Sequence, residues 1–297
     1  MMSGTDLPGP KDLPGSTEWA QEGTRTPGGL SRAERERYGR HLCLAGVGEP
    51  GQEKLKQAKV LVVGTGGLGS PAAFYLAAAG VGRLGIADSD RVDLSNLQRQ
   101  ILHSTSDIGR PKVESAAEKL ARLNPGCDVV GHAERVGAEN AARLIEEYDI
   151  VVDGTDNFKT RFILNDACVA AGKPFVHGAV LGWVGQAMTV VPGAGPCYRC
   201  VFGEAPGAGG GVPGDDSEES GRSEGVCASI SPERVGVLSP VPGVIGTIQA
   251  TEAIKLIVGA GEPLVGRLLI WDGLRMEFDR VEVARDPGCA ACGRLTD

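Results

Sequence analysis

Two pairs of cysteines have the spacing of metal ligands. Cys197 and Cys200 form the first C-x-x-C pair, and Cys289 and Cys292 form the second, near the end of the chain. Two such pairs supply the four thiolates of a tetrahedral structural zinc site, which leaves no coordination position for a substrate. The spacing therefore predicts a Zn²⁺ ion that ties the C-terminal segment to the chain after residue 191. A redox-active pair and unligated core cysteines are the alternatives.

A glycine-rich segment has the spacing of a nucleotide-binding loop. Gly64, Gly66 and Gly69 satisfy the pattern G-x-G-x-x-G between a predicted strand and a predicted helix, and Gly67 is a further glycine within it. Such a loop brings backbone N–H groups close to phosphates at a helix N-terminus. Asp88 ends the next predicted strand, where a carboxylate can bind ribose hydroxyls. The pattern predicts a nucleotide site without choosing between NAD and ATP, and its alternative is a turn that only allows tight helix–strand packing.

Two cations and one carboxylate are predicted to converge on the same edge of the sheet as this loop. Arg99 lies in a polar segment after the second strand, and Lys112 opens a helix. Asp156 follows the fourth strand, at the carboxyl edge where open α/β sheets bind ligands. Arg99 and Lys112 can neutralise phosphate charge, and Asp156 can hold Mg²⁺. Each could be a surface charge by itself, but the combination favours triphosphate chemistry over hydride transfer.

The elements that position these residues alternate between strands and helices. Short β-branched runs predict strands at 59–64, 83–88, 127–132, 149–153, 174–179 and 186–191. Helices are predicted at 31–57, where Ser31 and Glu34 form a capping box, and at 66–79, 112–123, 138–147, 158–171 and 244–258. A closing antiparallel hairpin is predicted from 267–272 and 276–283. This order predicts a Rossmann-like, mostly parallel α/β sheet with helices on both faces, extended by antiparallel C-terminal strands.

The composition of the 297 residues is that of a globular protein, with 41% apolar and 23% charged residues. Residues 1–30 and 203–225 carry most of the net charge of −8 and are rich in glycine and proline, so we expect a disordered tail and a mobile acidic loop. No uninterrupted apolar run approaches the length of a membrane helix, and no basic stripe suggests nucleic-acid binding. Eight cysteines without an export signal indicate a reducing cytoplasm.

These motifs together resemble the MoeB/ThiF/HesA adenylyltransferases, relatives of the ubiquitin-activating enzymes. The resemblance covers residues 30 to 293 and is carried by GTGGLG, DSDRVDLSNLQRQ, GRPKVES, DGTDN, both cysteine pairs and PGVIGTIQATEAIK. It implies that ATP adenylates the C-terminal glycine carboxylate of a ubiquitin-like sulfur-carrier protein ending in Gly-Gly, releasing pyrophosphate. The product would serve the biosynthesis of molybdopterin, thiamine or a related sulfur cofactor. A homodimer and a single ATP-binding domain at 31–297 are also implied.

The resemblance assigns roles to individual residues. It implies that Gly67 and its neighbours hold phosphate and that Asp88 binds the ribose. The side chains that would bind and polarise the phosphates are Asn96, Arg99 and Lys112. These roles agree with the chemistry expected from the residue types, because fixed cations stabilise the charge that develops on phosphoryl oxygens.

Further assignments concern the metal, the partner subunit and a possible covalent step. The resemblance places Asp156 near Mg²⁺ and Asn157 beside it in the nucleotide pocket, and it implies that Arg40 reaches the ATP of the partner subunit. Cys227 lies in the zone of the family's cysteine, with a covalent role or a loop cysteine without chemistry as the two interpretations. The loop before Cys227 is longer and more acidic than the family pattern. Because the chain ends at Asp297, a separate protein is expected to donate sulfur.

Three other functions share parts of this pattern. An NAD-dependent oxidoreductase would use the glycine loop and Asp88, but it leaves the two cations and the cysteine pairs unexplained. A non-catalytic, zinc-stapled module that binds a ubiquitin-like protein would need degenerate phosphate-binding residues. A dehydratase that activates a tRNA-borne carboxylate fits poorly with the near-neutral body of the chain and with the cysteine pairs. We therefore expect an adenylyltransferase.

Overall fold

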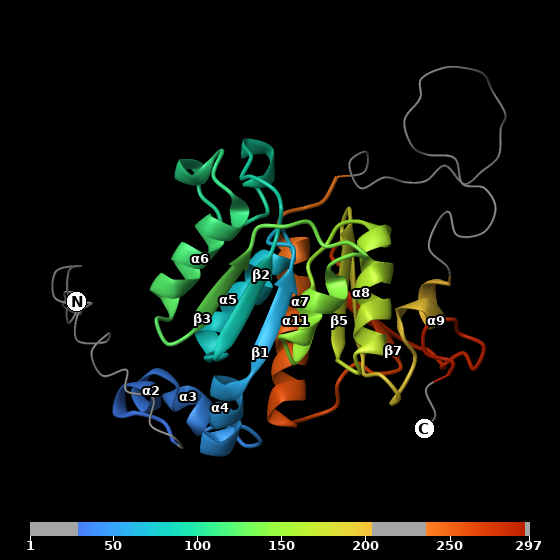
Figure 1. Cartoon of the computed structure of the whole chain (residues 1–297), viewed down its shortest axis with the longest axis horizontal. Helices are drawn as coiled ribbons and strands as arrows, with labels where there is room; N and C mark the ends of the chain where they lie inside the picture. Colours follow the sequence, from blue (N-terminus) through green and yellow to red (C-terminus); the bar gives the residue numbers. More distant parts are fainter. Residues whose placement is uncertain (1–28, 204–235, 295–297) are drawn as a thin grey trace.

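The structure is a computed structural model that describes residues 29–203 and 236–294 (Figure 1). The predicted disordered tail lies outside these ranges apart from its last two residues. The predicted acidic loop beyond residue 203 and Cys227 also lie outside them. The described ranges contain the glycine loop, both predicted cations and all four cysteines of the two pairs.

An eight-stranded sheet forms the centre of the described fold, in the order β3-β2-β1-β4-β5-β6-β7-β8. Strands β1 to β5 pair in parallel, whereas β6, β7 and β8 extend the sheet in antiparallel fashion. This confirms the predicted sheet. The strands are β1 (Lys59–Val63), β2 (Arg83–Ala87), β3 (Asp128–His132), β4 (Ile150–Asp153), β5 (Phe175–Leu181), β6 (Val184–Val190), β7 (Arg267–Asp272) and β8 (Glu277–Glu282).

Helices cover both faces of the parallel part of the sheet. Val60 and Val62 of β1 join one core with α5, α6 and α11, whereas Leu61 and Val63 join a second core with α7 and α8, as alternation along a strand requires. The helices are α2 (Arg32–Arg37), α3 (Gly39–Leu42), α4 (Gly48–Gln57), α5 (Gly69–Ala79), α6 (Lys112–Leu123), α7 (Ala141–Glu146), α8 (Phe158–Ala170), α9 (Tyr198–Phe202) and α11 (Pro240–Val258). Two 3₁₀ turns, η1 (Leu94–Asn96) and η2 (Thr105–Asp107), follow β2.

The helix predicted at 31–57 is divided into α2, α3 and α4. Its start is as predicted, because Ser31 and Glu34 form a capping box in which the Glu34 N–H donates to Ser31 Oγ at 3.2 Å. The prediction that residues 31–57 are helical throughout was wrong, since Gly46, between α3 and α4, has a positive φ angle of 87° and Gly48, the first residue of α4, has one of 56°. These angles lie in the left-handed region, which a right-handed helix cannot continue through.

Helix α11 begins four residues before its predicted start. Pro240 occupies its first turn, where the missing N–H of proline costs nothing. Among the described helices, α11 is long and apolar enough to span a membrane by length and composition, with a mean hydropathy of 1.3, and half of that stretch is buried. It packs on α5 and against β5 and β6, and this burial accounts for its apolar composition.

Candidate functional site

The glycine loop runs from the end of β1 into α5. Gly64 has a φ of 86°, and a Cβ there would lie 2.7 Å from the carbonyl oxygen of Gly154, after β4. A Cβ on Gly69 would lie 1.8 Å from the carbonyl oxygen of Gly64. These two glycines are therefore required by the packing of the turn itself. A Cβ on Gly66 or Gly67 would meet only side-chain atoms, so the middle of the loop is where a ligand can approach the backbone.

Asp88 lies beside the glycine loop, as predicted. Its Oδ2 accepts hydrogen bonds from Thr65 N at 2.8 Å and from Thr65 Oγ1 at 2.9 Å. Its Oδ1 accepts one from Asp90 N at 2.9 Å. Since a carboxylate offers about four acceptor positions, Asp88 can hold the loop and still accept a hydrogen bond from a ribose hydroxyl.

The segment that carries Arg99 folds back over the glycine loop. Arg99 Cγ lies 3.5 Å from where a Cβ of Gly67 would be. Among residues 29–203 and 236–294, the guanidinium of Arg99 makes only long hydrogen bonds of 3.3 Å, to Ser95 O and to Asn96 Oδ1. The Asn96 Oδ1 also accepts from Gln100 Nε2 at 2.7 Å, a contact that sequence reasoning missed. Arg99 is thus loosely held beside the loop, where it can exchange these contacts for a phosphate.

Lys112 opens α6 and is only 5% exposed. Its Nζ donates to Asp90 Oδ2 at 2.9 Å, and its backbone N–H donates to Asp90 O at 2.9 Å. The two contacts bring the start of α6 to the carboxyl end of β2, where Asp88 lies two residues earlier. Lys112 therefore lies at the carboxyl edge of the sheet, as predicted. It is paired there with Asp90, a carboxylate that the sequence interpretation had not singled out.

The segment after β4 places Asp156 and Asn157 at the same edge of the sheet. Asp156 is exposed. Asn157 is the N-cap of α8, where its Oδ1 accepts from Thr160 N at 2.9 Å. This capping contact gives Asn157 a structural role that the sequence interpretation lacked, although its side-chain NH₂ remains able to donate to a nucleotide.

A buried polar cluster, which sequence reasoning missed, holds this segment. Asp153 Oδ1 accepts from Thr155 N at 3.0 Å, and its Oδ2 accepts from His177 Nδ1 at 2.8 Å. Arg161 Nη2 donates to Thr155 O at 2.7 Å. Burial alone would raise the pKa of Asp153, but the His177 hydrogen bond and the Arg161 charge hold it below its ordinary value, whereas burial lowers the pKa of His177. An ionised Asp153 and a neutral His177 thus fix the turn before Asp156.

Arg40 lies far from the other predicted site residues of its own chain. It is exposed on α3, which lies beyond the amino ends of the parallel strands, whereas the glycine loop lies at their carboxyl ends (Figure 1). No hydrogen bond or ion pair joins its side chain to another residue within 29–203 or 236–294. The fold therefore keeps Arg40 away from the glycine loop of the same subunit.

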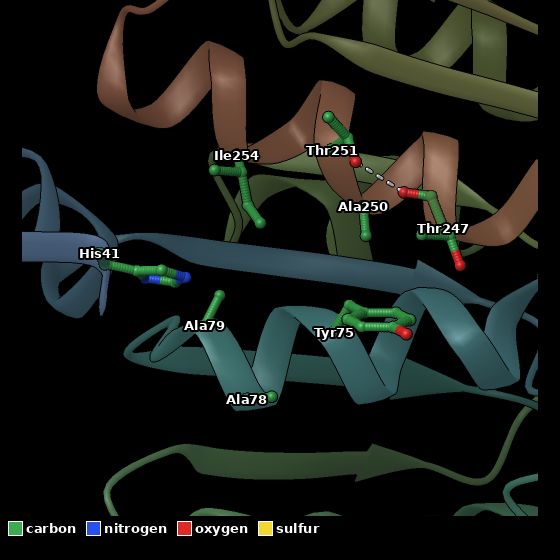
Figure 2. Close-up of a pocket in the computed structure, with 8 residues that line it drawn as sticks. All are labelled: His41, Tyr75, Ala78, Ala79, Thr247, Ala250, Thr251 and Ile254. Carbon is green, nitrogen blue, oxygen red and sulfur yellow. Dashed lines mark hydrogen bonds between the residues drawn. The ribbon is translucent and has the colours of Figure 1, made fainter. Parts of the chain in front are cut away.

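A pocket of about 180 Å³ lies between α3, α5 and α11 (Figure 2). Its lining contains neither a glycine of the loop nor any predicted site residue. The residues that line it are His41, Tyr75, Ala78, Ala79, Thr247, Ala250, Thr251 and Ile254. With no carboxylate, lysine or arginine in its wall, this pocket lacks the groups that would bind a triphosphate.

The two cysteine pairs meet in one cluster, with all four sulfur atoms within 4.8 Å of one another. Cys197 Sγ lies 3.9 Å from Cys200 Sγ and 3.6 Å from Cys289 Sγ, and Cys200 Sγ lies 3.4 Å from Cys292 Sγ. Four sulfurs at 2.3 Å from a tetrahedral ion are about 3.8 Å apart. The cluster therefore fits a metal ion and joins the C-terminal segment to α9, as predicted.

The chain is similar to known adenylyltransferases over most of its length. A sequence model of the ThiF family matches residues 38–291. The SAMP-activating enzyme E1 of Haloferax volcanii is 46% identical over 264 residues, covering 89% of this chain and 91% of that protein. The sulfur carrier protein adenylyltransferase of Thermus thermophilus is 43% identical over 268 residues, covering 89% of this chain and 92% of that protein.

The fold is also similar to that of a solved structure. The crystal structure of E. coli MccB with ATP matches with a TM-score of 0.71 at 25% sequence identity, covering 87% of this chain and 75% of that chain. The range matched by the family model contains the glycine loop, Arg40, Arg99, Lys112 and Asp156. The similarity therefore extends over the residues that the sequence predicts for a nucleotide site.

Proposed function

The chain belongs to the ThiF family and is an adenylyltransferase, and from this premise we propose that it adenylates the C-terminal glycine carboxylate of a ubiquitin-like sulfur-carrier protein ending in Gly-Gly. The observation that carries the proposal is the gathering of Asp88, Arg99 and Lys112 around a glycine loop at one edge of the sheet. The names of the two curated relatives support a carrier protein as the substrate. An NAD-dependent oxidoreductase would need no such pair of cations.

The reaction requires alignment and charge stabilisation more than proton transfer. A C-terminal carboxylate has a pKa of about 3.3–3.7, so it is ionised at neutral pH and needs no general base. One of its oxygens attacks the α-phosphorus of ATP, and a carboxylate–phosphorus bond forms. The bond from the α-phosphorus to the oxygen bridging to the β-phosphate breaks, and pyrophosphate leaves with the electron pair. Positioning in line and fixed positive charge lower this barrier.

Each nucleotide-site residue has a part in this chemistry. The loop presents the Gly66 and Gly67 backbone to the phosphates, and Asp88 accepts from the ribose. The side chains that bind the phosphates and stabilise their charge are Asn96, Arg99 and Lys112. Asp156 would hold Mg²⁺, with Asn157 beside it, and the ion supplies further positive charge to the polyphosphate when bound.

The cysteine cluster has the donors of a structural zinc site. Four thiolates suit Zn²⁺, and with every coordination position taken by protein the ion would act on folding, not on the reaction. We place the enzyme in the cytoplasm, where thiols stay reduced. The carrier would belong to molybdopterin, thiamine or related sulfur-cofactor synthesis.

The function is tested by ATP–pyrophosphate exchange with a purified ubiquitin-like carrier. We expect exchange that depends on the carrier, because the reverse reaction requires the carrier adenylate. The matched control is the same carrier lacking its terminal glycine, which should support no exchange. Binding of NAD with no carrier-dependent exchange would favour the oxidoreductase instead.

A homodimer in which Arg40 serves the partner's site predicts complementation between two inactive variants. Arg40→Ala and Asp156→Ala should each lose exchange activity. When subunits of the two variants are mixed in equal amounts and allowed to reassort, half of the dimers are hybrids, and each hybrid keeps one complete site of two. The mixture should therefore regain about a quarter of the wild-type rate. Mixing Arg40→Ala with itself is the control. If hybrid dimers form and stay inactive, Arg40 does not act across the dimer.

A further inference from the structure

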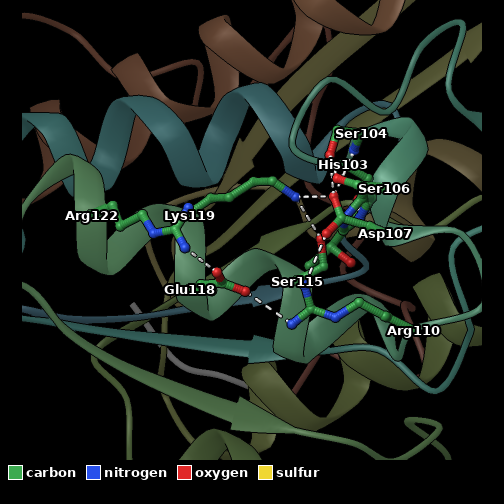
Figure 3. Close-up of polar contacts among 10 residues, drawn as sticks. His103, Ser104, Ser106, Asp107, Arg110, Ser115, Glu118, Lys119 and Arg122 are labelled. Atoms are coloured by element: carbon green, nitrogen blue, oxygen red, sulfur yellow. Dashed lines mark hydrogen bonds and ion pairs between the residues drawn. The ribbon is translucent and has the colours of Figure 1, made fainter. Parts of the chain in front are cut away.

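His103 is a buried histidine to which none of the roles above applies. It lies between η1 and η2 and is 6% exposed. Its Nε2 lies 3.2 Å from Thr65 O in the glycine loop. On the other side of the ring, Nδ1 lies 3.0 Å from Ser115 Oγ on α6, and Figure 3 shows His103 and Ser115 together. One imidazole thus joins the loop to the helix that begins with Lys112.

The partners of the imidazole decide where its proton lies. A carbonyl oxygen only accepts, so the Nε2 facing Thr65 O carries the hydrogen. On the other side, Lys119 Nζ donates to Ser115 Oγ at 2.8 Å, which leaves the Ser115 hydroxyl hydrogen for His103 Nδ1. Burial lowers the pKa of His103, in agreement with a neutral ring. The chain of hydrogen bonds therefore runs in one direction, from Lys119 to Thr65.

The far end of this chain is anchored at Asp107. This carboxylate is 3% exposed and accepts from Ser104 N at 2.8 Å, from Arg110 Nη1 at 3.0 Å and from Lys119 Nζ (Figure 3). Burial alone would raise the pKa of Asp107, but the hydrogen bonds from Lys119 and Ser104 outweigh it and hold the pKa well below its ordinary value. An ionised Asp107 thus fixes the ammonium that begins the chain.

The near end of the chain fixes a peptide of the glycine loop. Thr65 N and Oγ1 donate to Asp88, and Thr65 O accepts from His103 and, at 3.0 Å, from Ser70 Oγ. The carbonyl of Thr65 and the N–H of Gly66 belong to one planar trans peptide, in which they point in opposite directions. The Gly66 N–H has no acceptor among the described residues. The hydrogen bond from His103 to the Thr65 carbonyl therefore also fixes the direction of the Gly66 N–H, which points away from His103.

We propose that His103 is a positioning residue that fixes the Thr65–Gly66 peptide so that the Gly66 N–H meets the phosphates of ATP. The inference rests on the proposed function for the identity of the nucleotide. A positioning role for His103 differs from simple core packing in one measurable respect. A residue that only stabilises the fold changes the fraction of active enzyme, whereas a residue that orients the loop changes the affinity of each folded molecule for ATP.

The test compares equilibrium dissociation constants for ATP among His103→Leu, His103→Gln and the wild type. Glutamine carries an acceptor oxygen and a donor NH₂ on one carbon, as histidine carries Nδ1 and Nε2, so it can accept from Ser115 and donate to Thr65. We expect His103→Leu to raise the Kd for ATP about tenfold, which corresponds to the free energy of about one hydrogen bond. The Kd of His103→Gln should lie within about twofold of the wild-type value. Ser115→Ala, which keeps the imidazole, should raise the Kd about threefold.

Leu120→Ala is the matched control, because Leu120 is fully buried on α6, the helix that carries Ser115, and its apolar side chain makes none of these hydrogen bonds. It should lower the melting temperature and leave the ATP Kd unchanged. The role of His103 would be overturned if the wild type and His103→Leu had equal Kd values for ATP. It would also be overturned if His103→Gln folded but bound ATP as weakly as His103→Leu. If the leucine variant does not fold, the Ser115→Ala variant decides the question. An ATP Kd for Ser115→Ala equal to that of the wild type would then overturn the role of His103. ATP binding without carrier-dependent exchange would instead overturn the proposed substrate.

Discussion

Arg99→Ala is expected to lower carrier-dependent ATP–pyrophosphate exchange by about 10²–10³-fold, the usual loss for one donor that stabilises transition-state charge. Arg99 lies over Gly67, and within the described part of the chain its guanidinium is held only by hydrogen bonds of 3.3 Å. Such a guanidinium is free to follow the phosphoryl oxygens as charge builds on them. The loss should appear mainly in kcat, because the interaction strengthens in the transition state.

Two further variants make this result specific to Arg99. Arg122→Ala removes an exposed arginine of α6 that pairs with Glu118 and should leave exchange unchanged. Arg99→Lys keeps the charge but loses the planar fork of donors, so its activity should fall between wild type and alanine. An alanine variant that folds and exchanges at the wild-type rate would remove Arg99 from the reaction.

Cys200→Ser is expected to abolish stoichiometric zinc binding and to lower the melting temperature. Cys200 Sγ lies 3.4 Å from Cys292 Sγ and accepts from the backbone N–H of Asp286 at 3.5 Å. The cluster joins α9 to the C-terminal segment, so the free energy of metal binding is also free energy of folding. Metal content of the purified variant and thermal unfolding with and without a chelator measure the two effects.

Cys43→Ser is the control for this experiment, because Cys43 is an exposed cysteine outside the cluster. It should bind one zinc per chain and unfold at the wild-type temperature. The chelator should destabilise the wild type and Cys43→Ser, and have no effect on Cys200→Ser. A Cys200→Ser protein with full zinc content would show that the four sulfurs do not form the metal site.

The sequence by itself determined the architecture, and it predicted where a nucleotide site would lie on that architecture. Short β-branched runs alternating with helical segments predicted the parallel sheet, and the helix at 112–123 was placed at its observed bounds. The glycine spacing placed the loop between β1 and α5, and Asp88, Arg99 and Lys112 were predicted to reach its edge. These features are readable because they depend on local periodicity and on one topological rule, that parallel strands present their carboxyl ends together.

Only the tertiary structure decided which partner each of these groups has. It paired Lys112 with Asp90 and made Asn157 an N-cap. It also put α3, which carries Arg40, at the opposite end of the sheet from the glycine loop. It also joined His103 to Thr65, 38 residues earlier in the chain. Such contacts depend on how distant segments pack, and a histidine that orients a loop carries the same local pattern as one that fills a core. Sequence periodicity fixes the face on which a residue lies, whereas burial and hydrogen-bond geometry fix what it does there.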